Sequence, residues 1–240
     1  RNHSSAASDV YKRQVDIVED IAIGFGFQNL PLKLSTTHLD ALPLKSSNLK
    51  RRVGESLRAC GLQEVQSLTL SNERDQFENV RWPNEGYVTE IANPITSDHT
   101  LLRQYILPSL LRLLAANRHH ELPQRVYELG DVIRDSKNFL RAAWACAEVG
   151  SGFTSSKGIV QALLRDMGAI HDDVEFRPTD AEDGPWISGR GSHVFIQDEK
   201  SGEFGEIDPK VSGFFGIKSP IQAGEIDLEK IYRIIPDPIS

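Results

Sequence analysis

Short strand-like segments joined by turns, with helical segments between them, limit most strongly how this chain can fold. The clearest pair is 193–197 and 203–207, two strand-forming runs that flank the turn-rich segment 198–202 and predict a β-hairpin. Further strands are predicted at 64–70, 87–92, 125–133 and 221–228, while 139–149 fits either a strand or a helix. The pattern predicts an α+β protein with a mainly antiparallel sheet.

Helical periodicity and capping residues predict the intervening helices. Apolar residues at three- and four-residue steps indicate a helix over 15–25, ended by Gly24 and Gly26. The other expected helices begin at Ser47, at Asp98 through Tyr105, at Pro108, at Ser156 with an end at Gly168, and briefly at Asp208-Pro209. Residues 1–14 are polar and Ser/Ala-rich, which predicts a non-native or disordered leader, and 31–46 is predicted to be a linker.

Composition narrows the class of protein. A 240-residue chain with 39% hydrophobic and 25% charged residues can bury an ordinary core, which excludes disorder and collagen-like repeats. The net charge of −7 argues against a dedicated nucleic-acid-wrapping surface. The two cysteines form no CxxC, so a zinc site is not expected, and no apolar run reaches membrane-spanning length. We therefore expect a cytoplasmic protein with no membrane association.

Three carboxylates form the densest acidic feature. Asp16, Glu19 and Asp20 are spaced i, i+3 and i+4, so on a helix they share one face, as a hard cation such as Mg²⁺ would require. The alternative is an acidic first turn that the helix dipole stabilises. Spacing alone favours this alternative.

Other motifs carry less information. His119-His120 follows a leucine-rich helix, and we interpret the pair as a solvated helix end. Segment 184–191 is Gly-rich and is predicted to be a loop. Lys50-Arg51-Arg52 with Arg58 forms a basic helix face that is more often solvated than phosphate-binding. No phosphate-binding GxxxxGK[ST] motif and no GxSxG nucleophile motif are present. These residues alone predict only a soluble α+β protein of unknown activity.

Three longer segments point to a family. VDIVEDIAIGFGFQNLP at 15–31, NPITSDHTLLRQYILPSLLRLLAANRHHELPQRVYELGDV at 93–132 and GEFGEIDPKVSGFFGIKSPIQAGEIDLEKI at 202–231 together resemble the β subunits of phenylalanine–tRNA ligase, of the archaeal and eukaryotic type. The resemblance extends over almost all of the chain from Val15 and matches the C-terminal part of such a subunit.

The resemblance implies a fold and a division of labour. Residues 47–240 would form a class II synthetase-like antiparallel sheet flanked by helices, with 139–149 as a strand, and 15–30 would be the last helix of a winged-helix-like domain. In this family the α subunit binds ATP and phenylalanine, while β supports a heterotetramer of two α and two β subunits that charges tRNA(Phe). The chain would contact tRNA mainly through the complex and would hold no catalytic or cofactor-binding residue.

The resemblance also bears on particular residues. It makes Asp16, Glu19 and Asp20 three of the four ligands of a Mg²⁺ site shared with the α subunit. Segment 125–134 resembles a strand that in active enzymes carries a phosphate-binding arginine, but Asp135-Ser136-Lys137 follows it instead of Arg-x-Glu. We therefore expect no adenylate formation by this chain alone. The leucines of 101–114 are either part of a subunit interface or plain core.

An alternative from a different class is a free-standing class II synthetase-like enzyme, or a sensor of an amino acid or nucleotide. Such a protein needs its own phosphate-binding arginines, because a polyphosphate must be met by positive charge. The sequence offers Arg134, Arg141, Arg177 and Arg190 for that role.

Overall fold

The computed structural model describes residues 14–33, 43–150, 152–169, 173–180 and 183–234. The chain divides into two compact units, residues 1–42 and residues 43–240. In the first unit, α2 (Gln14–Phe25) is followed by the short 3₁₀ helix η1 (Phe27–Asn29). The helix predicted over 15–25 is confirmed, and it ends before Gly26, whose φ of 87° favours glycine. The predicted leader, apart from Gln14, lies outside the described residues, as does 34–42 of the predicted linker.

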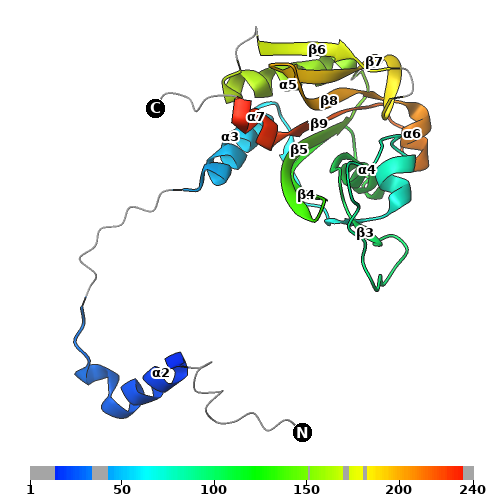
Figure 1. The fold of residues 1–240 in the computed structure, drawn as a ribbon. Coiled ribbons are helices and arrows are strands. Elements are labelled where there is room, and N and C mark those ends of the chain that lie inside the picture. The colour runs from blue at the N-terminus through cyan, green and yellow to red at the C-terminus, as the bar shows by residue number, and fades with distance from the viewer. Residues whose placement is uncertain (1–13, 34–42, 151, 170–172, 181–182, 235–240) are drawn as a thin grey trace. The chain divides into compact units, whose positions relative to one another are not determined.

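The second unit is built on a seven-stranded sheet in the order β1-β4-β5-β9-β8-β7-β6 (Figure 1). Its strands are β1 (Gln63–Glu64), β4 (Gln124–Arg134), β5 (Lys137–Ala147), β6 (Val174–Pro178), β7 (Trp186–Ile196), β8 (Glu199–Ile207) and β9 (Ile221–Asp227). Only the short β1–β4 pair is parallel, so the mainly antiparallel sheet is confirmed. A separate two-stranded sheet pairs β2 (Leu70–Ser71) with β3 (Leu101–Leu102).

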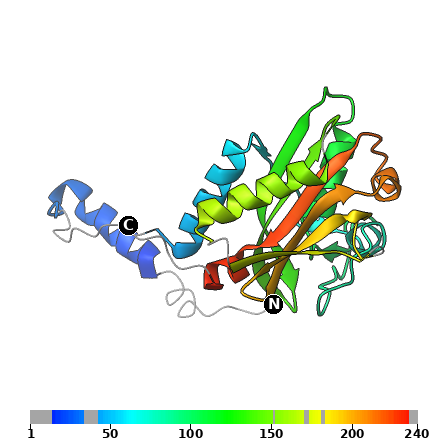
Figure 2. The same ribbon diagram turned by 90° about the horizontal axis from the view of Figure 1, so that it is seen from above.

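Helices cover both faces of the large sheet. They are α3 (Lys45–Ala59), α4 (Leu107–Ala116), α5 (Phe153–Met167), α6 (Pro209–Phe214) and α7 (Leu228–Ile234), with a π-helical turn at Arg74–Glu78. Helices α3 and α5 lie side by side on one face, and α4 lies on the other (Figure 2).

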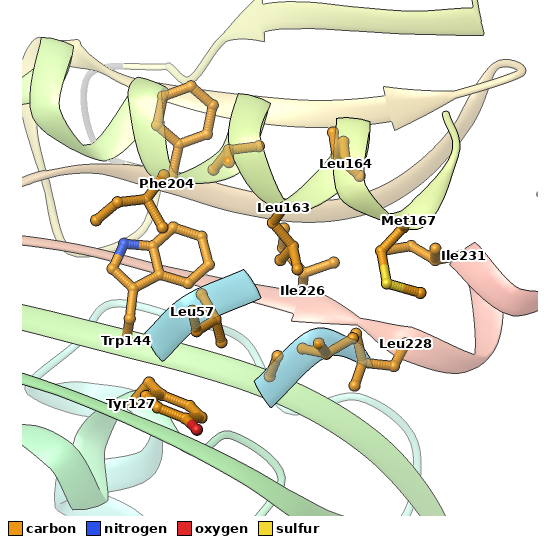
Figure 3. Packing of buried hydrophobic residues seen from close by; sticks show 14 of the residues in the cluster. Leu57, Tyr127, Trp144, Leu163, Leu164, Met167, Phe204, Ile226, Leu228 and Ile231 are labelled. Carbon is orange, nitrogen blue, oxygen red and sulfur yellow. The ribbon is translucent and has the colours of Figure 1, made fainter. Parts of the chain in front are cut away.

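Side chains of successive strand residues point to opposite faces of the sheet and pack in different cores. On β5, Trp144 packs in the core beneath α3 and α5, while Ala143 and Ala145 pack in the core beneath α4. Figure 3 shows Trp144 between Tyr127 of β4 and Phe204 of β8, with Leu163 of α5 nearby. For 139–149 the residues alone fit either a strand or a helix. The segment forms β5 as far as Ala147, because its two faces pack in two different cores.

The hairpin predicted around 198–202 is confirmed, with a tighter turn. Gln197 and Asp198 connect β7 directly to β8 and both have positive φ, as a two-residue hairpin requires. The predicted loop at 184–191 is wrong from Trp186 onward, because those residues begin β7. Strand β6 and helix α7 have no counterpart among the predictions.

Four other local predictions were wrong. Ser47 does not cap α3, which begins at Lys45, within the predicted linker. The segments 64–70 and 87–92 do not form continuous strands, and Asp98 starts no helix. The amide of Leu102 donates to the carbonyl of Thr89, and the amide of Arg103 donates to the carbonyl of Thr69. Pairing with two distant segments therefore replaces the local helix.

Candidate functional site

A charged cavity of about 250 Å³ lies on the sheet, on the face that also carries α4. Its floor comes from the ends of β4, β5, β8 and β9, and Trp82, Pro83 and Tyr105 form an apolar wall. Its charged lining residues are Glu85, Asp183, Glu203, Glu225, Asp227, Arg134, Arg141, Lys200 and Lys230. Five carboxylates against four cations give this lining a net charge of −1.

The two arginines of the cavity are already occupied. Arg141 donates from Nη1 to Glu225 Oε1 at 3.0 Å and from Nη2 to Glu85 Oε2 at 2.9 Å. Arg134 pairs with the same Glu85 carboxylate and donates to Asp227 Oδ2 at 3.2 Å. Burial lowers the pKa of Arg141, but the two carboxylates outweigh burial and the pKa is raised. Both guanidinium groups are therefore paired with carboxylates of the chain itself.

Glu225 joins this network to helix α4. Its Oε2 accepts the backbone amides of Ile106 and Leu107, each at 2.9 Å, where unpaired amides mark the start of the helix. Complete burial raises the pKa of Glu225, while Arg141 and the two amides act in the opposite direction. The carboxylate thus has structural partners on both oxygens.

Glu203 holds the other side of the cavity. Its Oε2 accepts the indole N–H groups of Trp82 at 3.1 Å and Trp186 at 3.0 Å. Its Oε1 lies 2.6 Å from the Lys200 ammonium nitrogen. Burial alone would raise the pKa of Glu203, but its neighbours, first the His193 imidazole and then Lys200, outweigh burial and lower the pKa to about 2.

The lowered pKa of Glu203 predicts a loss of stability in acid. A carboxyl whose pKa falls from 4.5 to about 2 on folding stabilises the fold above the unfolded pKa, and this contribution disappears as the pH falls from about 5 to about 2. We expect Glu203 to contribute about 3 kcal/mol to the free energy of unfolding at neutral pH. Denaturant titrations between pH 2 and pH 7 measure this contribution. Glu203→Gln should flatten the dependence, and an unchanged slope would contradict the assignment.

A second buried ion pair lies on the same face of β4. Arg103 donates from Nη2 to Glu128 Oε1 at 2.7 Å, and the Ser67 hydroxyl donates to Glu128 Oε2 at 2.5 Å. The guanidinium also donates to the Ser67 oxygen and to the carbonyl of Asp131. Glu128, in the strand resembling a phosphate-binding element, therefore serves an internal contact.

The other arginines proposed for phosphate have partners as well. Arg177 donates to Glu175 and Asp198, and Arg190 donates to Glu206. On α3, Arg51 pairs with Glu55, Arg58 pairs with Glu64, and Arg52 donates to the carbonyls of Asp166 and Met167. The four arginines of the alternative hypothesis are thus each bound to carboxylates, and the structure brings only Arg134 and Arg141 together.

The acidic trio lies on α2 as the spacing predicts. Asp16, Glu19 and Asp20 are exposed carboxylates, and oxygen ligands of this type suit Mg²⁺. Among the described residues, however, no group of three or more His, Cys, Asp or Glu side chains is arranged to hold a metal ion. A Mg²⁺ site at these three carboxylates stays a prediction, and such a site would need further ligands from outside the described residues.

Leucine-rich α4 belongs to the core of this chain. Leu107, Leu110, Leu111 and Leu114 are buried in the cluster between the helix and the sheet. The described part of the chain contains no helix long and apolar enough to cross a membrane.

Sequence reasoning missed most of the cavity's residues. Glu85 is held by Gln104, whose side-chain oxygen accepts the Glu85 amide at 2.7 Å and whose Nε2 donates to the Glu85 carbonyl at 2.9 Å. Glu85 lies in a turn-rich segment without periodicity, and its arginine partners lie 49 and 56 residues away. No spacing within the sequence could have indicated these contacts.

Comparisons with known proteins agree on one family. The model of the phenylalanyl tRNA synthetase beta chain CLM domain matches residues 30–228. A phenylalanine–tRNA ligase beta subunit from Archaeoglobus fulgidus is 32% identical over 219 residues, covering 90% of this chain and 39% of the relative. Those from Methanococcoides burtonii and Pyrococcus horikoshii are 35% and 33% identical, covering 89% and 91% of this chain and 38% and 39% of the relatives. The chain thus spans about two fifths of their length.

A solved structure has the same fold. The pyrrolysyl tRNA synthetase of Desulfitobacterium hafniense superimposes with a TM-score of 0.60 at 14% identity, covering 79% of this chain and 68% of that one. This likeness places the antiparallel sheet and its helices in the fold of class II tRNA synthetases. Since the family model covers most of the sheet domain and the beta subunits match across nine tenths of the chain, the chain belongs to the family of phenylalanine–tRNA ligase beta subunits.

Proposed function

We propose that this chain is the non-catalytic support module of a phenylalanine–tRNA ligase beta subunit. In this role it holds the alpha subunit in place while the complex attaches phenylalanine to tRNA(Phe) with ATP. The observation that carries the proposal is the cavity on the sheet, whose arginines are neutralised by the protein's own carboxylates.

The charge of the cavity supports this division of labour. The polyphosphate of ATP carries several negative charges and is bound by cations that are free to contact it. Here Glu85 and Asp227 contact Arg134, and Glu225 contacts Arg141. A polyphosphate would therefore have to displace the chain's own carboxylates, of which Asp227 and Glu225 are buried. The lining would meet the ligand with a net charge of −1. We assign ATP and phenylalanine to the alpha subunit.

The assembly we propose contains two alpha and two beta subunits and works in the cytoplasm. Residues 15–30 would be the last helix of a winged-helix-like domain, 31–46 a linker, and 47–240 the support module. The relatives' names, which specify a beta subunit of a tRNA ligase, support an alpha partner. Contact with tRNA(Phe) would come mainly through the complex.

We further propose that Asp16, Glu19 and Asp20 contribute to a Mg²⁺ site shared with the alpha subunit. The oxygen chemistry and the common helix face fit the ion. Because the described residues offer no complete ligand set, the remaining ligands must come from outside them. Mg²⁺ would then bring the two subunits together through charge neutralisation.

Co-purification with the alpha subunit tests this function. The tagged 240-residue chain should capture the cognate alpha subunit, and the recovered complex should charge tRNA(Phe) with phenylalanine. Capture should weaken when EDTA removes Mg²⁺, and Asp16→Ala with Asp20→Ala should weaken it equally in the presence of Mg²⁺. Asp173→Ala with Asp198→Ala removes the same charge from the second unit and serves as the control.

The outcomes separate the claims. Failure of a folded chain to capture alpha would contradict the support role. Capture that is indifferent to Mg²⁺ and to the α2 variant would retain the support role and remove the shared metal site. The enzyme or sensor alternative is favoured by none of the arginine contacts in the structure.

A further inference from the structure

A cationic hollow lies where α4 ends and β4 begins. It measures about 480 Å³ and adjoins a second hollow of about 600 Å³, with which it shares His120 and Gln124. The rim of the first hollow carries Arg118, His119, His120 and Lys218, and neither hollow is lined by an aspartate or glutamate. This hollow carries cations although the chain as a whole has a net charge of −7.

Arg118, which lines this hollow, differs from most other arginines of the chain in the contacts of its guanidinium group. Among the arginines that the structure describes, most lie within ion-pair distance of a carboxylate, and Arg52 and Arg233 donate to carbonyls. For Arg118 and Lys218 the described residues supply no such acceptor. Their charges are therefore available to a ligand, unlike those of the cavity on the sheet.

The rim is held in shape by the protein's own hydrogen bonds. Gln124 donates from Nε2 to the carbonyls of Asn117 at 3.0 Å and His120 at 3.2 Å, which fixes the turn that carries Arg118. On the opposite wall, Gly216 has a φ of 76°, and a Cβ atom there would lie 3.8 Å from Arg118 Nη1. Arg118 thus reaches the wall of the hollow that also carries Lys218.

We propose that this hollow binds phosphodiester groups of an RNA backbone. Arginine, lysine and the N–H groups of histidine are donors that contact phosphate oxygens, and the adjoining hollow leaves room for the chain to continue. The lining residues include no phenylalanine, tyrosine or tryptophan on which a base could stack, so binding should be independent of sequence. The negative charge of the whole chain disfavours contact elsewhere and directs a polyanion to this place.

The inference rests on the proposed function, because a tRNA ligase supplies the RNA. Whereas the sequence predicts tRNA contact mainly through the complex, the hollow adds a small direct contact by this chain. Arg118 and Lys218 line this hollow and are absent from the cavity on the sheet. If the unaltered chain captures the alpha subunit but does not bind RNA, this inference is rejected and the proposed function stands.

The test measures binding of fluorescently labelled 12-nucleotide U and A RNAs to the 240-residue chain at several salt concentrations. Arg118→Ala with Lys218→Ala should weaken binding about 10- to 30-fold at 0.1 M salt and make the slope of log K against log salt shallower by about 1.4, the value expected for two lost phosphate contacts on a single strand. The two RNAs should bind alike.

The matched control is Lys50→Ala with Lys137→Ala. Both lysines are exposed and line neither hollow. Replacing them removes two positive charges, as the Arg118 and Lys218 substitutions do. This control should change affinity less than threefold, and both double variants should keep the wild-type melting temperature. Equal losses in the two double variants, or no RNA binding by the unaltered chain, would overturn the proposal. Displacement of RNA by inorganic phosphate at matched ionic strength would show a free-phosphate site instead and would also overturn it.

Discussion

Glu128→Ala should destabilise the protein by about 3–5 kcal/mol, the cost of leaving a buried charge without its partner. Arg103 is 2% exposed and Glu128 is 1% exposed, so water cannot replace the missing carboxylate. The variant also removes the acceptor of the Ser67 hydroxyl and amide. Urea unfolding measures the loss.

Two controls separate this effect from a general effect of charge. Glu55→Ala removes one partner of the exposed pair with Arg51 and should cost less than about 1 kcal/mol. Arg103→Met with Glu128→Leu removes both charges and should recover much of the stability lost in Glu128→Ala. A loss below 1 kcal/mol in Glu128→Ala would contradict the buried ion pair.

Gly224→Ala should destabilise the protein by about 3 kcal/mol, because the added methyl group has no space. Gly224 on β9 lies directly opposite Trp144 on β5. A Cβ atom at Gly224 would meet Cζ2, Cη2 and Cε2 of the Trp144 ring inside van der Waals distance. Trp144 is fully buried in the core of Figure 3 and cannot move outward.

A double-mutant cycle tests that mechanism. Trp144→Leu frees the volume next to Gly224, so the combination with Gly224→Ala should cost about 1–3 kcal/mol less than the sum of the single changes. Gly213→Ala is the control, because nothing lies within 4 Å of a Cβ at that position in α6, and its effect should stay within about 1 kcal/mol. Additive costs in the cycle would show that the destabilisation does not come from the tryptophan ring.

Local signals predicted the parts of the fold that depend on local interactions. Gly168 ends α5 with a φ of 93°, and Asp208 caps α6 by accepting the Lys210 amide. The predicted hairpin is also present, although its turn is Gln197-Asp198 rather than 198–202. Each of these features involves only a few neighbouring residues. Periodicity likewise placed Leu163 and Leu164 on the buried side of α5.

The predictions failed where distant segments compete with local structure. Ser156 was expected to cap α5, but Gly152 stands at that position and the buried Ser156 hydroxyl donates to the carbonyl of Ala223 at 2.8 Å. Glu225 accepts the amides of Leu107 and Ile106, which lie 118 and 119 positions before it in the sequence. Such pairs leave no pattern in a single sequence, so the cavity's internal neutralisation became visible only in the structure.

The resemblance predicted the family, which the comparisons show, and the paired arginines of the cavity support the proposal that this chain forms no adenylate. An arginine at 134 or 141 could be taken for a phosphate ligand from the sequence alone. Their shared partner Glu85, and the further carboxylates Asp227 and Glu225, show that the positive charge is already used. These contacts agree with the support role that we propose for this chain.

The measurement that tests this claim most directly is calorimetric titration of Mg²⁺·ATP into the isolated 240-residue chain, compared with the complete alpha–beta complex. We predict saturable binding by the complex and no binding by the isolated chain up to 1 mM nucleotide. Stoichiometric binding of ATP to the isolated chain, lost in Arg141→Met with the fold retained, would contradict the claim that this module leaves nucleotide chemistry to its partner.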